Sequence, residues 1–411
     1  MVPDSVLLEI FDFYRVGHDA HGFSLCPILR WPTLVHVCKR WRHIVFASPL
    51  RLELRLICTH GTPVKKNLSF WPPIPLIIDY NTYWGGDKGK SLTPSDEDNI
   101  IAALVNSNRV RYVKISVTSS LLGKVVTAMK EPFPMLTHLW LSSEDMNKPV
   151  LSEAFMGGSA PRLLFAHLKG IPFPALPTLL LSATDLVHLQ LLNIPKTGFV
   201  SQDEMVAGLA ALTSLETLSI EFQAPLLDRR LRLPLTPICF PCLTNFSFRG
   251  VSEYLEDLVA QIDTPLLNTF TATYFNQLSI QIPQLSQFIS RTQGLDLSRF
   301  KCAKVDFGGD NVYVHLDCDQ AEQLGSRFTL GISCQRLDWQ VAHMAQVLSQ
   351  CFATATLTSV DDLSINAHDL QPGWEEDVDS TEWTSLLRLF TSVEMPHISM
   401  QLAEHLWSPT C

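Results

Sequence analysis

The sequence is poor in charged residues and has no excess of basic ones. Only 18% of its 411 residues are Asp, Glu, Lys or Arg, whereas 46% are hydrophobic. A chain with so much apolar material and so little charge lies outside the disordered class, so we expect it to fold. Its 31 basic residues are outnumbered by 41 acidic ones, which gives a formal net charge of -10. Because this charge does not attract phosphate backbones or anionic lipids, we expect no nucleic acid and no membrane as partner.

Long hydrophobic runs are also missing. No stretch reaches the roughly 18 to 20 apolar residues that a membrane helix needs. The start of the chain carries Asp4 and Glu9, where a secretory signal would have a basic segment and an unbroken apolar one. The ten cysteines are spread over the whole length, and in a reducing compartment they are expected to be free thiols. The sequence therefore predicts an intracellular protein, cytoplasmic or nuclear.

Signatures of catalysis are lacking. There is no Gly-x-Ser-x-Gly elbow and no Gly-x-Gly-x-x-Gly opening a helix. The segment GGDKGKS at 85–91 comes closest to a phosphate-binding loop, but Trp84 stands where such a loop needs glycine. We interpret it as a surface turn before a helix capped by Thr93 or Ser95. A nucleotide-hydrolysing protein is kept as a minor alternative.

Metal sites are equally weakly supported. Cys239 and Cys242 form the single Cys-x-x-Cys pair, whereas a structural zinc site needs four ligands. Histidines at 138, 167 and 188 could converge from neighbouring strands, but histidines on a sheet surface are commonly without a metal. We therefore expect no catalytic residue, no cofactor and no metal, and we expect that the chain is not an enzyme.

What the sequence does contain begins with two amphipathic segments. Residues 3–14 place Leu7, Ile10, Phe11 and Tyr14 at the spacing of one helical face. Residues 32–45 then place further apolar side chains on one face of a second helix: Leu34, Val37, Cys38, Trp41 and Val45. Fewer than about fifty residues cannot bury two such faces alone. A partner or a neighbouring domain must cover them.

These two segments resemble the F-box family, whose pattern runs Leu-Pro-x-Glu-Leu-Leu-x-Glu-Ile and then Val-x-Lys-x-Trp. The first half is matched by Pro3, Leu7, Leu8, Glu9, Ile10 and Phe11, and the second by Leu34, Val37, Cys38, Lys39, Arg40, Trp41 and Arg42. An insertion around 15–30 departs from the pattern. The segment after residue 45 is similar to the linker of many fungal F-box proteins, so the resemblance covers roughly the first 80 residues.

The resemblance implies that the helices dock onto a Skp-type adaptor and through it onto a cullin. Insertion of an apolar helix face into a groove is a common recognition mode. The residues implied to bind the adaptor are Pro3, Leu7, Leu8, Ile10, Phe11, Leu34, Val37, Cys38 and Trp41. The alternative is that these side chains pack on the next domain of the same chain.

The rest of the chain repeats an apolar-x-x-apolar-x-apolar phrase. It begins at residues 110, 136, 163, 186, 215, 243 and 267. Successive phrases are thus 23 to 29 residues apart, within the range of leucine-rich repeats, and each alternates as a strand with one buried face should. Helical spacing at 202–212 and 253–262 lies between strands, which predicts a strand-then-helix unit.

The predicted fold class is therefore α/β: a small all-α F-box-like helical module followed by a leucine-rich-repeat-like solenoid of parallel strands alternating with helices. We divide the chain into residues 1–50 for the module, 51–104 for a linker with the first strand and helix of the array, and 105–411 for the solenoid. The array is irregular after about 295, where strands are expected near 303, 312, 327 and 361 and a helix at 339–352. It lacks a regular Asn ladder, since residues such as Glu144 and Ile171 stand where the asparagine belongs.

The third and fifth positions of each phrase should face away from the helices. On the early strands they carry aromatic and imidazole groups, of the kind enriched at recognition sites: His138, Trp140, Phe165, His167 and His188. These residues are predicted to bind a protein substrate, although they could equally be ordinary surface. The family resemblance then implies the substrate-recognition subunit of a Skp-cullin-F-box ubiquitin ligase. The alternative is a repeat-built interaction scaffold without a ligase role.

Overall fold

The computed structural model describes most of the chain. The described residues are 2–15, 31–49, 51–80, 92–116, 118–145, 148–226, 237–277, 279–318, 326–352, 357–368, 380–399 and 402. The insertion around 15–30 and the segment 85–91 lie outside them.

Strands and helices alternate along the chain. The strands are β1 Leu56–Cys58, β2 Leu76–Tyr80, β3 Val110–Ser116, β4 His138–Ser142, β5 Phe165–Lys169, β6 His188–Ile194, β7 Thr217–Phe222, β8 Ile238–Cys239, β9 Asn245–Gly250, β10 Ile262–Asp263, β11 Thr269–Phe275, β12 Cys302–Phe307, β13 Val312–Asp317, β14 Arg327–Ser333, β15 Asp362–Ala367 and β16 His397–Ile398. The helices are α1 Asp4–Arg15, α2 Trp31–Val37, α3 Lys39–Ala47, α4 Val64–Phe70, α5 Pro94–Leu104, α6 Ser119–Ala128, α7 Leu176–Leu180, α8 Gln202–Leu209, α9 Ser252–Ala260, α10 Pro283–Arg291, α11 Leu337–Cys351 and α12 Ser380–Leu387. Short 3₁₀ turns occupy Ser107–Arg109, Phe155–Gly158, Lys196–Gly198, Gln293–Leu295 and Leu297–Arg299.

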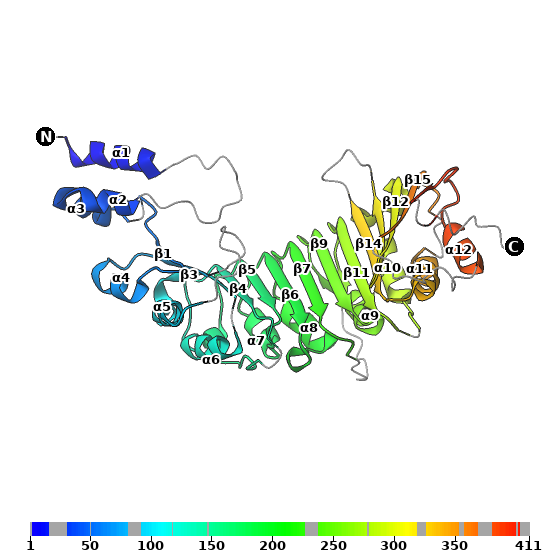
Figure 1. The fold of residues 1–411 in the computed structure, drawn as a ribbon, viewed down its shortest axis with the longest axis horizontal. Coiled ribbons are helices and arrows are strands. Elements are labelled where there is room, and N and C mark those ends of the chain that lie inside the picture. Colours follow the sequence, from blue (N-terminus) through cyan, green and yellow to red (C-terminus); the bar gives the residue numbers. More distant parts are fainter. Residues whose placement is uncertain are drawn as a thin grey trace.

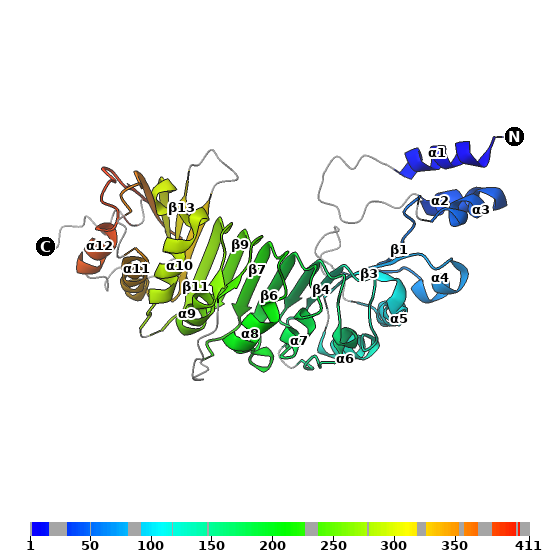
Figure 2. The ribbon, with the colours of Figure 1, turned by 180° about the vertical axis from the view of Figure 1, so that it is seen from behind.

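One 14-stranded sheet runs through the molecule in the order β1-β2-β3-β4-β5-β6-β7-β9-β11-β14-β13-β12-β15-β16, and β8 and β10 form a separate parallel pair. From β1 to β11 neighbouring strands are parallel. Helices α4 to α11 line one face of this sheet, as both views show (Figures 1 and 2). We call the other face the open face. A mostly parallel sheet alternating with helices confirms the predicted α/β class.

Each strand contributes alternate side chains to a single core beneath the helices. Leu139 and Leu141 of β4 are buried there, whereas His138 and Trp140 lie on the open face. All of the strands predicted from residue 110 onward are present. The helices pack on one another in sequence: an added Cβ at Gly208 of α8 would lie 2.7 Å from the Cα of Pro177 in α7, so glycine permits this close approach.

The last part of the sheet corrects the prediction of a continuous parallel array. β13 runs antiparallel to both β12 and β14. Only residues 308–311 separate β12 from β13, and so short a connection makes a hairpin, since a parallel crossover needs a dozen residues or more. β14 then pairs with β11, and β15 pairs with β12, both parallel. Between β11 and β15 the sheet therefore contains β14, β13 and β12, in the reverse of their order along the chain.

The second predicted helix is also corrected. Residues 32–45 form two helices, α2 and α3, broken at Cys38, whose backbone is extended with φ -158° and ψ 168°. The Cys38 sulfur accepts a hydrogen bond from the Trp41 amide, and Arg42 Nε donates to the Val35 carbonyl at 2.9 Å. These contacts satisfy groups at the new helix ends. As a result, Leu34 and Val45 are buried while Val37 and Cys38 are exposed.

Candidate functional site

The helical module α1 to α3 has a packed interior. Leu7 and Phe11 of α1 are buried, and the Phe11 ring meets the Trp41 ring edge to face, with centroids 4.8 Å apart. Asp4 pairs with Arg40 of α3 at 2.5 Å, and Glu9 pairs with Arg51. One face of α1 is therefore fully used within the module.

α1 has a second apolar face, which points outward. Val6, Ile10 and Phe13 are 45%, 50% and 82% exposed. They follow the i, i+4, i+7 spacing of one helical stripe. Ile10 is one of the residues that the F-box resemblance implies in adaptor binding; Val6 and Phe13 are not among them, although the same spacing identifies all three. We call these three residues the outer stripe of α1.

The nine residues implied to bind an adaptor divide into two groups in the structure. Leu7, Phe11 and Leu34 are buried, and Leu8 and Trp41 are partly buried against the core. Exposed positions are occupied by Pro3, Ile10, Val37 and Cys38. The buried side chains cannot contact another protein directly in this conformation, so they serve to hold the exposed ones in place.

On the open face, parallel strands bring the five predicted substrate-facing residues together. His138, Phe165 and His188 stand opposite one another on β4, β5 and β6, and one step along the strands Trp140 stands opposite His167. Because parallel strands in register lie about 4.8 Å apart, their side chains form continuous rows.

These rows are stacked rings. The Trp140 and His167 rings lie 3.7 Å apart and within 19° of parallel, and the Trp140 and Phe165 rings lie 6.1 Å apart. Tyr112 extends the stack on β3, 5.5 Å from His138, and Lys114 Nζ lies 4.9 Å from the Trp140 ring centroid. We call Tyr112, Lys114, His138, Trp140, Phe165, His167 and His188 the aromatic cluster. Tyr112 and Lys114 were not predicted. They occupy the third and fifth positions of the phrase that begins at residue 110, so the same rule could have identified them.

Two imidazoles of this cluster favour the neutral form. Burial lowers the pKa of His138, and Arg111 lowers it further; burial also lowers the pKa of His167, which the hydrogen bond with Gln190 only partly offsets. His167 is only 3% exposed and stacks on the Trp140 ring, so it offers little surface of its own. Its Nδ1 lies 2.8 Å from Gln190 Oε1, which as assigned makes Nδ1 the donor. The cluster is thus a row of aromatic rings with the Lys114 ammonium beside it, a surface suited to contact.

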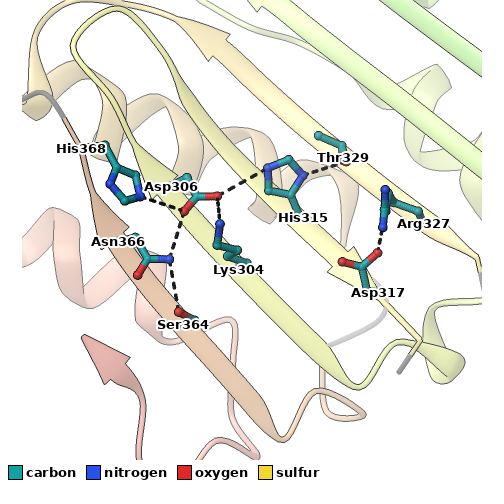
Figure 3. A network of polar contacts seen from close by, with 9 residues as sticks. All are labelled: Lys304, Asp306, His315, Asp317, Arg327, Thr329, Ser364, Asn366 and His368. Atoms are coloured by element: carbon teal, nitrogen blue, oxygen red, sulfur yellow. Dashed lines mark hydrogen bonds and ion pairs between the residues drawn. The ribbon is translucent and has the colours of Figure 1, made fainter. Parts of the chain in front are cut away.

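Farther along the open face the side chains become polar. Asp306 of β12 accepts hydrogen bonds from Asn366 Nδ2 at 3.0 Å and pairs with Lys304 Nζ at 2.7 Å (Figure 3). His315 Nε2 lies 3.7 Å from the same carboxylate, and its Nδ1 contacts Thr329 at 3.0 Å. The charge of Asp306 is therefore compensated by Lys304 within this group.

Cys239 and Cys242 are exposed free thiols. Within the described ranges, no group of three or more His, Cys, Asp or Glu side chains is placed to hold a metal ion. Among the helices that the structure describes, none has the length and apolar character needed to cross a membrane. The nucleotide-binding alternative at 85–91 falls outside the described residues.

Comparison with protein-family models and with curated proteins finds no match to this chain.

Proposed function

We propose that the chain is the substrate-recognition subunit of a Skp-cullin-F-box ubiquitin ligase. In this proposal the α1–α3 module binds a Skp-type adaptor, and through it a cullin, while the open face of the sheet binds the protein to be modified. The observation that carries the proposal is the outer stripe of α1, which exposes Val6, Ile10 and Phe13 on a module whose inner face is already packed.

An exposed apolar helix stripe is suited to a groove on another protein. Burial of apolar surface contributes about 25 cal/mol per Å², and large aromatic side chains commonly dominate such interfaces. Phe13 is the most exposed of the three, which makes it the strongest candidate anchor. Pro3, Val37 and Cys38 are exposed on the same module and belong to the F-box-like pattern, so they would extend the contact.

The aromatic cluster supports the second half of the proposal. Trp140 and Phe165 are half-buried on the open face, held side by side by the strand register. Rigid aromatic side chains lose little conformational entropy on binding. The contribution of the chain to ubiquitin transfer would be positional: it would raise the effective concentration of target lysines near the conjugating enzyme.

A second candidate is an interaction scaffold whose amino-terminal helices cap the array. It is favoured by the packing of the module on the rest of the chain. The Trp31 ring lies 5.0 Å from the Trp71 ring, and Trp31 Nε1 donates to the Arg55 carbonyl at 3.2 Å. A cap requires this contact, but it gives no reason for the exposed outer stripe of α1.

Copurification with a Skp-type adaptor separates the two candidates. We expect the wild-type chain to bind the adaptor and the Ile10→Asp/Phe13→Asp variant to lose it while keeping its circular dichroism spectrum. Phe70→Asp is the matched control, because Phe70 is 75% exposed on α4 away from the outer stripe; it should bind normally. A folded wild-type chain that does not bind the adaptor would favour the scaffold.

The target half is tested separately. A Trp140→Ser/Phe165→Ser variant should still bind the adaptor. The complex that contains this variant should not ubiquitinate the substrates that the wild-type complex modifies. Unchanged modification of those substrates would exclude the aromatic cluster as the target surface.

A further inference from the structure

The reversed strands at the carboxyl-terminal part of the sheet create a second candidate site. An open pocket of about 660 Å³ lies where β9, β11 and β14 end, beside the turn between β12 and β13. Its walls include Arg249, Asn276, Asn311, Ser333, Arg336 and Trp339. In open α/β sheets, ligands commonly bind beyond the carboxyl ends of the strands.

Arg249 is the unusual residue of this pocket. Its Nε is buried and has no hydrogen-bond partner, and its Nη2 makes one long contact of 3.5 Å to Ser333 Oγ. The guanidinium lies over the Phe275 ring, 5.7 Å from its centroid. Among the residues that the structure describes, Arg249 forms no ion pair. A buried N–H without a partner costs free energy, and an anion in the pocket could accept from it.

The acidic side chain on the neighbouring strand does not supply that anion. Glu221 of β7 stands opposite Arg249 in the strand register, yet no ion pair joins the two in the described part of the chain. Burial raises the pKa of Glu221, and Arg249 only partly offsets this effect. Asp310 also lines the pocket, but it lies on an exposed turn.

The pocket is held open by a buried glutamine. Gln340 of α11 is fully buried, and its Nε2 donates to the Gly308 carbonyl at 2.8 Å and to the Cys334 carbonyl at 2.6 Å. These carbonyls belong to the β12–β13 turn and to the segment after β14, two sides of the pocket. A preformed site loses less entropy when a ligand binds.

One further feature suits an anion attached to something larger. At the start of α11, Asp338 pairs with Arg336 at 2.7 Å, so Arg249 is the cation that remains for a ligand. Trp339 is 40% exposed at the rim, with the Arg336 guanidinium 5.7 Å from its ring. A large exposed ring next to a cationic site offers contact to the apolar part of a ligand.

We propose that this pocket binds a phosphate group, which accepts hydrogen bonds from Arg249. The planar guanidinium favours such oxyanions because two of its N–H groups can bind them together. The group could be carried by a peptide side chain or by a small free anion. β11 and β14, at whose ends the pocket lies, are far from α1 (Figure 1), and the pocket does not include the aromatic cluster, so it does not depend on the proposed function.

Isothermal titration of the full chain tests the pocket. The probes are inorganic phosphate, a capped phosphoserine peptide and the same peptide with serine. We expect the wild-type chain to bind phosphate and phosphopeptide saturably, Arg249→Gln to weaken both at least tenfold, and Arg249→Lys to fall between. Arg327→Gln is the matched control, because Arg327 is exposed on the sheet and pairs with Asp317; it should bind as the wild type does.

A second variant keeps the test decisive if Arg249→Gln does not fold. Ser333→Asp places a carboxylate beside Arg249, so it should preserve the fold and abolish binding of both probes. A phosphopeptide that binds at least tenfold more tightly than phosphate supports the pocket with a peptide ligand, and equal affinities support it with a free anion. Binding that is unchanged in Arg249→Gln and Ser333→Asp, or no saturable binding of either anionic probe to the wild type, would overturn the proposal.

Discussion

The rings of Phe11 and Trp41 meet edge to face, with their centroids 4.8 Å apart and their planes at 60°. Phe11 is fully buried, whereas Phe13, two residues later on the same helix, is 82% exposed. α1 thus has one face that holds the module together and another that is available to a partner.

Replacement of Phe11 by alanine should destabilise the module. Loss of a buried phenylalanine typically costs about 3–5 kcal/mol, because the transfer free energy is lost and a cavity is left behind. We expect hydrogen exchange to accelerate strongly at the amides of α1 and α3 in Phe11→Ala, while the amides of the sheet remain protected. Phe13→Ala is the control and should leave exchange near wild type. Similar exchange in the two variants would mean that the Phe11 contact does not hold α1.

The stability of the protein should depend on the protonation of His167. Burial lowers the pKa of this imidazole below its ordinary value of 6.5, so between the two values the unfolded chain binds a proton that the folded chain does not. The contribution of His167 to the free energy of unfolding is therefore fully present above pH 6.5 and is lost as the pH falls below it, by at most about 1.4 kcal/mol per pH unit. Below the folded-state pKa this contribution levels off.

Urea unfolding of the wild type and of His167→Gln at pH 5 and pH 8 measures this effect. At pH 8 the comparison reports only the change in packing, because the imidazole is neutral in both states. The loss between pH 8 and pH 5 should be smaller in His167→Gln. An equal loss in the two proteins would show that His167 does not titrate differently on folding.

The carboxylate of Asp306 should control the charge of His315. The Asp306 and His315 side chains lie 3.7 Å apart on adjacent strands (Figure 3). Burial lowers the pKa of His315, and Asp306 opposes this effect by favouring the imidazolium. Asp306→Asn should therefore lower the His315 pKa further, which an NMR titration of the ring protons can follow.

Asp317→Asn is the matched control for this titration. Asp317 also favours the His315 imidazolium, but less strongly than Asp306, and it is already paired with Arg327 at 2.9 Å. We expect a smaller decrease in the His315 pKa in this variant. A larger effect from Asp317 than from Asp306 would contradict the arrangement in Figure 3.

Glu256 should contribute strongly to the free energy of unfolding, although it is a charged residue on a helix. It is 5% exposed on α9 and accepts hydrogen bonds from the amides of Gln284 and Leu285 at 2.7 and 2.8 Å, at the start of α10. A carboxylate there satisfies unpaired N–H groups and complements the helix dipole. Glu256→Ala should cost about 2–4 kcal/mol in chemical denaturation. Glu253→Gln, on the exposed side of α9, should stay within about 0.5 kcal/mol of wild type.

The sequence predicted the repeating part of the fold well. The apolar phrases at 110, 136, 163, 186, 215, 243 and 267 each became a strand with its repeated apolar letters in the core. Their alternation is local, and the exclusion of apolar side chains from water acts on each phrase in the same way. Strand register then followed from that repetition, which brought His138, Phe165 and His188 into one row.

The sequence did not predict the features that depend on tertiary contacts, such as the helix break at Cys38. Residues 32–45 carry helical spacing throughout, with no glycine or interior proline to mark the break at Cys38. β13 has the alternation of the other strands, which does not show its reversed direction; the short connection at 308–311 was the signal for it. The pairing of Asp306 with residues on neighbouring strands depends on that reversal.

The sequence by itself determined which side chains are buried along each strand, because a period of two fixes the face of every residue once one face is apolar. The tertiary structure alone decided which residues become neighbours across long separations in the chain. It divided α1 into an inner and an outer face, buried His167 under Trp140, and left Arg249 in a pocket with unused donors. These outcomes depend on which strand pairs with which and on how α1 packs against α3, and both are set by packing between segments far apart in the chain, which no local pattern encodes.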